Sequence, residues 1–470
     1  MTGSTLGLVA VNVLYFAVGV GLLPILRIAR TWGEVLARLP LAYLLGVAAT
    51  AIVAAHLALI EVPLGLAELV VLAGIVLLVA WRRLRGTPAS DDLPLAREPG
   101  WSTAVGAAAL VLCAVLLVHA WRTFELRPLL EWDGWAIWGT RARALYEFGG
   151  ATGPVFTTQE YLPLQHPLLL PALEAMDFRA MSAFDPTLVH VQLVLLAIGF
   201  LAAFATLLRG FVPEYVIGLV ALALLAAEPV LKQLSTNMAD VPLALFVGLG
   251  LAGLGRWLVT DETWPLVAGS VFLAAATLTK NEGALFVLLA LVAAVPAART
   301  RLRTLGLAAA AVALVLLPWR LNVALRDLPL VEYELSNALS PSYLSDNSER
   351  VSPAARGLAD EIFTLDWGLL PLVFAAALVA AVAARRYAVA AFAALWVALA
   401  FAGLVVVYWI STIPIELALV WSGDRTIITI VVGAASLAAV LAGAASPVAL
   451  AAGQEPEDVE GRLLPAGARH

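Results

Sequence analysis

The sequence predicts an all-α polytopic integral membrane protein, and three observations lead to this fold class. Of its 470 residues, 62% are hydrophobic and only 13% are charged, whereas a soluble domain carries about 25% charged residues. The mean hydropathy is +0.93. Apolar runs of roughly 20 residues, the length that a helix needs to cross a bilayer, recur along the chain. So few charged side chains cannot cover a water-facing surface, which excludes a soluble enzyme and a nucleic-acid-binding protein.

Thirteen apolar runs predict about 13 transmembrane helices. They lie near residues 5–26, 38–60, 63–81, 102–121, 186–208, 213–231, 239–257, 264–279, 283–298, 303–323, 368–384, 388–409 and 426–446. The eighth and ninth runs are short and almost adjacent, so we expect them to form a tight helical hairpin.

The arginines predict which side of the membrane each loop faces. Short cytoplasmic loops are rich in Arg and Lys, so the arginines of the 82–100 loop place that loop inside and the N-terminus outside. The same alternation puts two long segments, 122–185 and 324–367, on the extracytoplasmic face, where we expect interfacial helices. Arginine greatly outnumbers lysine, which indicates a bacterial protein of the cytoplasmic membrane.

Three parts follow from this layout. Residues 1–101 form an N-terminal three-helix membrane segment with a cytoplasmic loop, and residues 102–446 form the module that carries both long outer loops. Residues 447–470 combine Gly, Pro and mixed charge, which predicts a disordered cytoplasmic tail. Cys113 is the single cysteine, so no intramolecular disulfide can form.

Six charged residues lie at or just beyond predicted membrane ends on the outer face: Asp133, Asp240, Lys280, Glu282, Asp424 and Arg425. A charge at a membrane boundary costs free energy, so it is usually paired, snorkelling or functional. Each residue alone is also typical of a helix end, as for Asp240 just before Pro242. Six such residues from four separate connections favour a shared polar site.

Asp133 is the candidate for proton transfer. It lies between Trp132 and Trp135 in the first outer loop, and a partly desolvated carboxylate is suited to general base catalysis. Its position is also typical of a helix N-cap, and the two roles are compatible. Glu131 is the less favoured neighbouring carboxylate.

Lys280 is the candidate for binding an anion. It stands between two predicted helices and is one of only two lysines. A compact ammonium there can bind an anion at the membrane surface, with Asn281 and Glu282 to orient it. A snorkelling helix stop is the alternative. Arginine would serve that role equally well, so the choice of lysine favours function.

Further polar residues of the outer face complete the candidate site. The pair Asp424 and Arg425 precedes the last run and Arg320 ends the tenth, and guanidinium groups suit phosphate oxygens. Arg141 follows the tryptophan-rich segment and suits a phosphate or a lipid headgroup equally. A proline-broken element supplies the last candidates, Tyr161, Gln165 and His166. His166 also fits a turn cap.

Nucleotide hydrolysis and metal sites have no motif here. The chain contains no G-x-x-x-x-G-K-[ST] loop, no H-E-x-x-H and no Cys/His metal spacing. Energy must therefore arrive in an activated substrate or a gradient.

Several of these elements, in this order, resemble the GT-C superfamily of membrane glycosyltransferases, in its protein O-mannosyltransferase-like and aminoarabinose-transferase-like branch. They are the acidic residue of the first outer loop, Asp133; the helix start Asp240 to Phe246; the Thr-Lys-x-x-Gly hairpin at 279–283; the late arginine, Arg425; and YLPLQHPLLLP at 161–171, which is similar to a Tyr-Pro-Pro-Leu motif. The similarity covers roughly residues 102–430. The chain departs from the family in its three extra N-terminal helices, in Asn-Glu-Gly where Gly-Pro is common, and in Thr426 where tyrosine is usual.

The resemblance implies transfer of a sugar from a polyprenyl-phosphate donor to a hydroxyl of a glycan, lipid or protein acceptor, on the outer face. It implies that Asp133 is the catalytic base, Asp240 the second acidic-motif residue, and Lys280 with Arg425 the donor-phosphate ligands, to which we add Arg141. One-step attack would invert the anomeric carbon. No cofactor is required. A divalent metal is compatible with the acidic residues, but the basic residues make it unnecessary.

Two other functions remain open from the sequence. A transporter or lipid-linked glycan flippase would need ionisable groups near the bilayer midplane, of which Glu68 is the clearest. A glycan polymerase or ligase would share the donor class and bind its phosphate with arginine.

Overall fold

The structure, a computed structural model, describes residues 3–87, 99–126, 129, 131–158, 163–329 and 335–446. The predicted tail 447–470 and the candidate residue Tyr161 lie outside the described residues. Within them the chain is helical, with no β-strand, as the fold class predicts.

Each apolar run corresponds to a helix or, in one case, to a bent helix pair. The bounds are α1 (Gly3–Ile25), α3 (Leu39–Ala58), α4 (Leu66–Leu84), α5 (Gly100–Leu126), α9 (Val189–Leu208), α10 (Glu214–Ala226) with α11 (Glu228–Leu234), α12 (Asp240–Thr260), α13 (Thr263–Thr279), α14 (Asn281–Ala294), α15 (Leu302–Leu325), α18 (Leu370–Ala383), α19 (Tyr387–Trp409) and α20 (Ile415–Ala445).

Shorter helices occupy the connections between these long ones. They are α2 (Trp32–Ala37), the π-helix η1 (Asp133–Gly139), α6 (Thr140–Phe148), α7 (Pro154–Thr157) and α8 (Leu169–Met181), then η2 (Leu335–Leu339), α16 (Pro341–Asp346), η3 (Ser348–Arg350), α17 (Val351–Ile362) and η4 (Leu365–Trp367). All except α2 lie in the two long loops that the sequence predicts for the outer face.

Eight of the described helices are long and apolar enough to cross a membrane, or nine if α10 and α11, bent by 66°, form one span. Three more, α13, α14 and α18, are apolar but only 14 to 17 residues long. α4 carries three charges, Glu68, Arg82 and Arg83. A polytopic membrane fold is therefore confirmed at the coarse level, while thirteen crossings stay a prediction.

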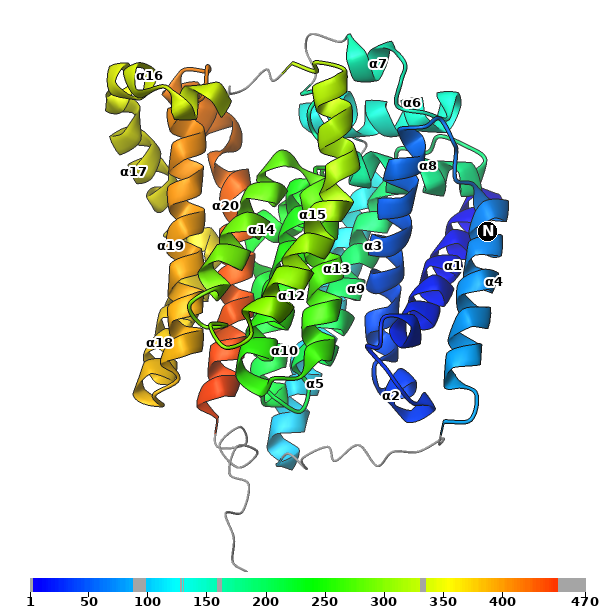
Figure 1. The fold of residues 1–470 in the computed structure, drawn as a ribbon, viewed down its shortest axis with the longest axis horizontal. Helices are drawn as coiled ribbons and strands as arrows, with labels where there is room; N and C mark the ends of the chain where they lie inside the picture. The colour runs from blue at the N-terminus through cyan, green and yellow to red at the C-terminus, as the bar shows by residue number, and fades with distance from the viewer. Residues whose placement is uncertain are drawn as a thin grey trace, which may run out of the picture.

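The centre of the bundle is formed by α12 and α20, which pack on each other, and α12 also packs on α13 (Figure 1). Their most apolar stretches are 83% and 89% buried, whereas those of α5 and α15 are 28% and 17% buried. An apolar helix that leaves most of its surface uncovered in the protein is suited to contact with lipid. α5 and α15 thus present surface suited to lipid, and the central pair α12 and α20 forms the frame on which the site is built.

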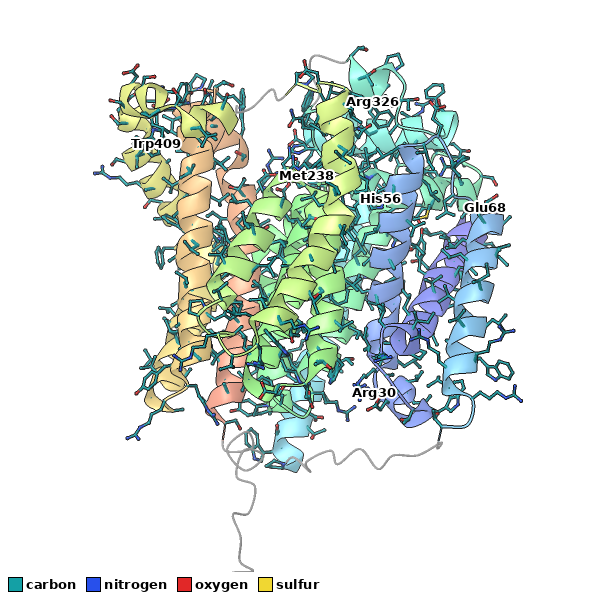
Figure 2. All side chains as sticks on the ribbon, viewed as in Figure 1. Arg30, His56, Glu68, Met238, Arg326 and Trp409 are labelled. Atoms are coloured by element: carbon teal, nitrogen blue, oxygen red, sulfur yellow. The ribbon has the colours of Figure 1, made fainter. Side chains whose placement is uncertain are left out.

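The two ends of the bundle differ. α6, α7, α8, α16 and α17 gather at the upper end in Figure 1, while α2 and the start of α5 lie at the lower end. Arg30 is labelled at the lower end in Figure 2, and Glu68 and Arg326 at the upper end. Glu68 accepts a hydrogen bond from the backbone N–H of Gly65 at 3.0 Å and so caps α4. This cap places Glu68 at the end of its helix and not at mid-span.

Two local predictions need correction. The last helix begins at Ile415, right after Pro414, so Asp424 and Arg425 lie inside α20 and do not precede it. The spacing of three residues between Trp132, Trp135 and Trp138 predicts that they share one helical face, but the structure does not place them on one face. Trp132 and Trp135 are about half exposed, whereas Trp138 is buried, because the π-helical geometry of η1 changes the angle between successive side chains.

Candidate functional site

A cavity of about 730 Å³ lies at the upper end of the bundle. It is bounded by η1, by the first turns of α12 and α14, and by the facing ends of α19 and α20. Eight charged side chains line it: Glu131, Asp133, Lys232, Asp240, Lys280, Glu282, Asp424 and Arg425. Seven of these were singled out from the sequence, and two of them, Asp133 and Arg425, are 292 residues apart.

Lys280 is the single residue between α13 and α14, and its backbone is extended (φ −152°, ψ 159°). Its Nζ contacts Asp240 Oδ1 at 2.9 Å and Glu282 Oε1 at 3.2 Å. Burial acts to lower the pKa of Lys280, but these two carboxylates outweigh it and hold the pKa above its ordinary value. Lys280 is therefore a fixed cation at neutral pH.

The α13–α14 hairpin is tight because of Gly283. A Cβ atom at this position would lie only 2.0 Å from the carbonyl oxygen of Ala276, so a larger residue would push the two helices apart. The prediction of a tight hairpin is confirmed, and the glycine of the Thr-Lys-x-x-Gly motif has a packing role. It brings the N-terminus of α14, with Glu282 in its first turn, against Lys280.

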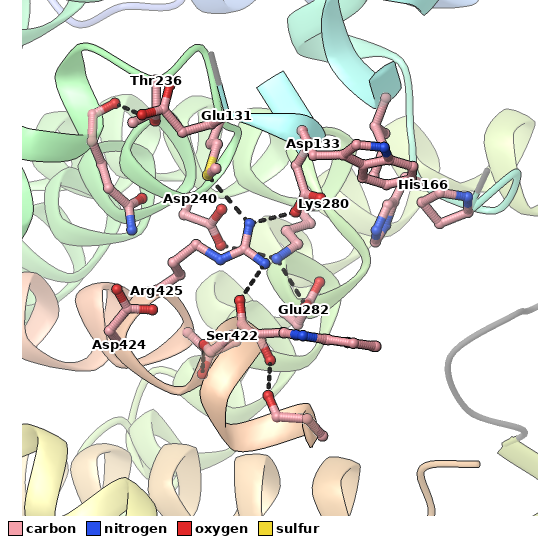
Figure 3. Close-up of a pocket in the computed structure, with 18 of the residues that line it drawn as sticks. Glu131, Asp133, His166, Thr236, Asp240, Lys280, Glu282, Ser422, Asp424 and Arg425 are labelled. Atoms are coloured by element: carbon pink, nitrogen blue, oxygen red, sulfur yellow. Dashed lines mark hydrogen bonds and ion pairs between the residues drawn. The ribbon is translucent and has the colours of Figure 1, made fainter. Parts of the chain in front are cut away.

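Asp240 is the first residue of α12, and its side chain is almost fully buried. A carboxylate at a helix N-terminus is favoured by the partial positive charge of the unpaired backbone N–H groups. Its ion pair with Lys280 then leaves two buried charges that neutralise each other, as Figure 3 shows.

Arg425 projects from α20 across the cavity to form an ion pair with Asp133 on η1 (Figure 3). Its guanidinium also contacts Met238 Sδ at 3.2 Å and donates to the carbonyl oxygen of Trp421 at 2.7 Å. The pairing explains how a charged residue can lie inside a long apolar helix. It also places the candidate base in direct contact with a candidate phosphate ligand.

Asp133 opens the π-helix η1, which packs closely on the turn before α12. A Cβ atom at Gly134 would lie 2.1 Å from the carbonyl oxygen of Thr236, so only glycine allows this approach. π-helical segments are rare and concentrate at functional sites. This contact fixes the position of Asp133 relative to Asp240, which begins α12.

His166 forms part of the cavity wall opposite Arg425. Its ring stacks on Trp138, with the ring centroids 5.4 Å apart and the planes inclined by 25°. Burial, and then the positive charges of Lys280 and Arg141, hold the pKa of His166 well below its ordinary value. His166 is therefore neutral and offers a hydrogen-bonding ring to a ligand.

Four predicted site residues do not line the cavity. Arg141 is fully buried behind the wall, where it donates to the carbonyl oxygen of His166 at 2.8 Å and lies over the Phe156 ring. Burial lowers its pKa to about 9. Arg141 thus supports the wall and is not placed to reach a phosphate. The others are Gln165, Asn281 and Arg320.

The reasons differ for these three residues. The side chain of Gln165 donates to the carbonyl oxygen of Leu328, and the backbone carbonyl oxygen of Gln165 accepts from Trp319 Nε1 at 3.2 Å. Asn281 is buried at the start of α14. Arg320 lies on α15, and its positive charge acts on His166.

Sequence reasoning missed several residues of the cavity. Tyr408 lies at the end of α19, with its hydroxyl 2.8 Å from Ser422 Oγ and 3.2 Å from Thr426 Oγ1. Nothing in the apolar run around Tyr408 distinguishes it. Lys232 is the second lysine of the chain, so the rarity that identified Lys280 would have identified it as well.

The arrangement combines cations, carboxylates and apolar surface in one cavity. Lys280 and Arg425 can bind a phosphate, the carboxylates can accept hydrogen bonds from hydroxyl groups, and Asp133 can accept a proton. Val420 and Trp421, on the α20 side, are 80% and 57% exposed, which gives one wall an apolar surface. No group of three or more His, Cys, Asp or Glu side chains suited to a metal ion occurs among the described residues.

Comparisons with protein-family models, with curated proteins and with solved structures give no match to this chain.

Proposed function

We propose that the protein is a membrane glycosyltransferase that moves a sugar from a polyprenyl-phosphate donor to an acceptor hydroxyl. The observation that carries this proposal is the pairing inside the cavity, where Lys280 is held by Asp240 and Arg425 is held by Asp133. Two fixed cations and a carboxylate base within one cavity are the groups that displacement of a phosphate at an anomeric carbon requires.

The ion pair between Arg425 and Asp133 implies that the donor binds before the acceptor. In the resting site the guanidinium of Arg425 is paired with the carboxylate of Asp133, so that carboxylate is not free to contact an acceptor hydroxyl. The donor phosphate competes with Asp133 for Arg425, because a guanidinium binds phosphate through two parallel hydrogen bonds. Donor binding therefore frees the carboxylate of Asp133 for the acceptor.

The transfer step then proceeds by displacement. The acceptor oxygen bonds to the anomeric carbon as its proton passes to Asp133, and the bond from that carbon to the phosphate oxygen breaks. Lys280 and Arg425 stabilise the charge that develops on the leaving polyprenyl phosphate. A single displacement inverts the anomeric carbon. No step needs a metal ion, although Asp133 and Asp240 carry oxygen ligands of the type that Mg²⁺ prefers.

The apolar side of the cavity supports a lipid-linked donor. The exposed side chains of Val420 and Trp421 belong to a helix long and apolar enough to cross the bilayer, so a prenyl chain can stay in lipid while its phosphate reaches Arg425. We place the protein in the bacterial cytoplasmic membrane with the cavity facing outward. The arginine distribution of the sequence supports this orientation.

A transporter or flippase is the competing function. Its clearest intramembrane acid in the sequence, Glu68, caps a helix end in the structure. Two other acids of α8, Glu174 and Asp177, are fully buried, but α8 lies at the same end of the bundle as the cavity (Figure 1). A glycan polymerase or ligase uses the same donor chemistry and differs only in its acceptor.

The test is the identity of the lipid that the protein retains. Purified protein should carry a polyprenyl-phosphate sugar, identified by mass spectrometry of its lipid extract. The double variant Lys280→Ala with Arg425→Ala should lose it. The control Arg303→Met, an exposed cation at the start of α15 and so at the other end of that helix from Arg326, should retain it. Retention of bulk phospholipids alone by the unmodified protein would contradict the proposal.

A further inference from the structure

A smaller recess of about 60 Å³ adjoins the cavity on the side of α11. The cavity and the recess share Lys232, Gln233 and Asp424 in their walls, so a ligand in one can extend into the other. The other wall residues of the recess come from α11, from the end of α17 and from the segment around η4: Glu228, Pro229, Glu361, Thr364, Asp366 and Trp367. The mechanism above uses none of these six residues.

Packing between the second long outer loop and the bundle forms the recess. η4 packs on α11, and α17 packs on α20. Two side chains of the η4 segment donate to the backbone carbonyl oxygen of Glu361: Thr364 Oγ1 at 3.1 Å and Trp367 Nε1 at 2.9 Å. Trp367 is buried. These contacts hold the end of α17, and with it Glu361, against the edge of the cavity.

Negative charge dominates the recess. Its walls carry one ammonium and four carboxylates, those of Lys232 and of Glu228, Glu361, Asp366 and Asp424. None of these five groups takes part in a salt bridge within the part of the chain that the structure describes. Burial, and then the charges of Asp424, Asp366 and Asp360, raise the pKa of Glu361. The carboxylates thus repel one another and would be stabilised by a cation.

Gln233 supplies a second, independent indication of a ligand. It is only 4% exposed, and its Oε1 atom is buried without a hydrogen-bond partner. Buried polar atoms in folded proteins almost always have a partner, and an amide oxygen can only accept. Gln233 lines both the cavity and the recess. A ligand there has to bring hydrogen-bond donors.

The position of Asp424 separates the recess from the donor phosphate. Asp424 lies on one side of Arg425, whereas Lys280 and His166 lie on the other side (Figure 3). The cations that suit a phosphate therefore stand between the recess and His166. A phosphate placed in the recess would meet four carboxylates and one ammonium, so the recess suits a different part of the substrates.

We propose that the recess binds an ammonium group of the acceptor, so that the acceptor is a hydroxyl-bearing molecule that also carries an amine. An ammonium brings three donors and one positive charge, which match the carboxylates and the amide oxygen of Gln233. A metal ion is the other kind of cation, but the described carboxylates form no group suited to hold one. Assignment of the ammonium to the acceptor rests on the proposed function, whereas binding of the cation does not.

The test compares two probes that differ in their amines. The glucosamine tetramer obtained from chitosan and its N-acetylated form are titrated into the purified protein in a neutral detergent, at about pH 6, where amines carry a proton. Calorimetry measures each Kd. The amine form should bind at least about tenfold more tightly, since hydrogen bonds to charged groups are the stronger ones. The double variant Glu361→Gln with Asp366→Asn should lose most of this preference.

The matched control is the double variant Asp346→Asn with Glu349→Gln. It removes the same two charges at exposed positions of the same outer loop, on α16 and η3, and should keep the preference. Equal Kd values for the two probes in the unmodified protein would overturn the proposal. So would an equal loss in both double variants, because the preference would then follow from overall charge.

Two further outcomes keep the test decisive. If the recess double variant fails to fold, Glu228→Gln at an exposed position should reduce the preference at least about twofold, and no reduction would overturn the proposal. Retention of a polyprenyl-phosphate sugar without any amine preference would count against the recess alone. An amine preference in a protein that retains only bulk phospholipids would confirm the cation site and contradict the proposed function.

Discussion

The acidic residues of the cavity and those of α8 differ in whether a basic side chain pairs with them. In the cavity, Asp133 and Asp240 each form an ion pair with a basic side chain. On α8, Glu174 and Asp177 are more deeply buried and have no ion pair among the described residues.

The difference shows that burial alone does not set the charge of a carboxyl group. A buried acid stays ionised when a cation and hydrogen bonds compensate the lost hydration, and it takes up a proton when they do not. Asp133 and Asp240 in the cavity are therefore paired with cations. Glu174 and Asp177 on α8 instead have raised pKa values, so each favours its neutral form. The following four predictions test this contrast, from the largest expected effect to the smallest.

Asp133→Asn should give the largest effect. The variant keeps the size of the side chain but cannot accept the acceptor proton, so the transfer rate should fall by about 10²- to 10⁴-fold. The rate is measured as sugar transfer from the retained donor, with product detected by mass spectrometry. Glu147→Gln, an exposed change outside the cavity, is the control. Transfer at a normal rate by the Asn variant would show that Asp133 is not the base.

Lys280→Met should strongly destabilise the fold. It leaves Asp240 and Glu282 buried without their cation, and breaking a buried ion pair in this way costs about 3–5 kcal/mol. Thermal unfolding in detergent measures the loss. Adding Asp240→Asn to the variant removes one of the stranded charges and should recover part of the stability. Equal unfolding temperatures for Lys280→Met and the unmodified protein would mean that the ion pairs of Lys280 with Asp240 and Glu282 contribute little to stability.

The pH dependence of stability should distinguish the two clusters directly. A raised pKa means that the folded protein keeps a proton on Glu174 that the unfolded chain releases above its ordinary pKa of 4.5. Stability should therefore fall as pH rises above about 4.5, at up to about 1.4 kcal/mol per pH unit for this proton. Glu174→Gln should make the decline shallower at little cost in stability. An unchanged slope would mean that Glu174 is ionised in the folded protein.

Lys232→Met should have the smallest effect. Lys232 lines the cavity but its side chain is exposed, and exposed charges contribute about 1 kcal/mol or less. The unfolding temperature should be unchanged, and transfer should change by less than about fivefold. A loss comparable to that of Lys280→Met would show that both lysines bind the donor, and that exposure is a poor guide to function here.

Much of the fold followed from hydropathy, because a run of apolar residues needs no partner to be recognised as a helix. The cavity residues were predictable where a residue was unusual for its place, as Lys280 is between two apolar runs. The number of membrane crossings was not predictable from the sequence, because length and composition do not decide whether the short helices α13, α14 and α18 cross the membrane.

Residues whose state depends on distant partners escaped prediction. The start of α20 was misplaced because hydropathy counts Arg425 as a charge, although Asp133, 292 residues away, neutralises it. Glu174 and Asp177 stand in a segment expected to be an outer loop, where acids are ordinary, whereas in the structure α8 packs on α1, α3 and α6 and both acids are buried. The π-helix that turns Trp138 inward has no pattern in the sequence.

The balance of charge around the cavity has a consequence for what it admits. Five of its eight charged side chains are acidic, and both inner cations are already engaged by carboxylates. A bare phosphate, or the headgroup of phosphatidic acid, brings negative charge without alcohol hydroxyl groups, so it meets repulsion from the five carboxylates. A molecule that also offers several hydroxyl groups can donate to the carboxylates while its phosphate engages the cations. The balance of charge in the cavity therefore favours an anion that also carries several hydrogen-bond donors.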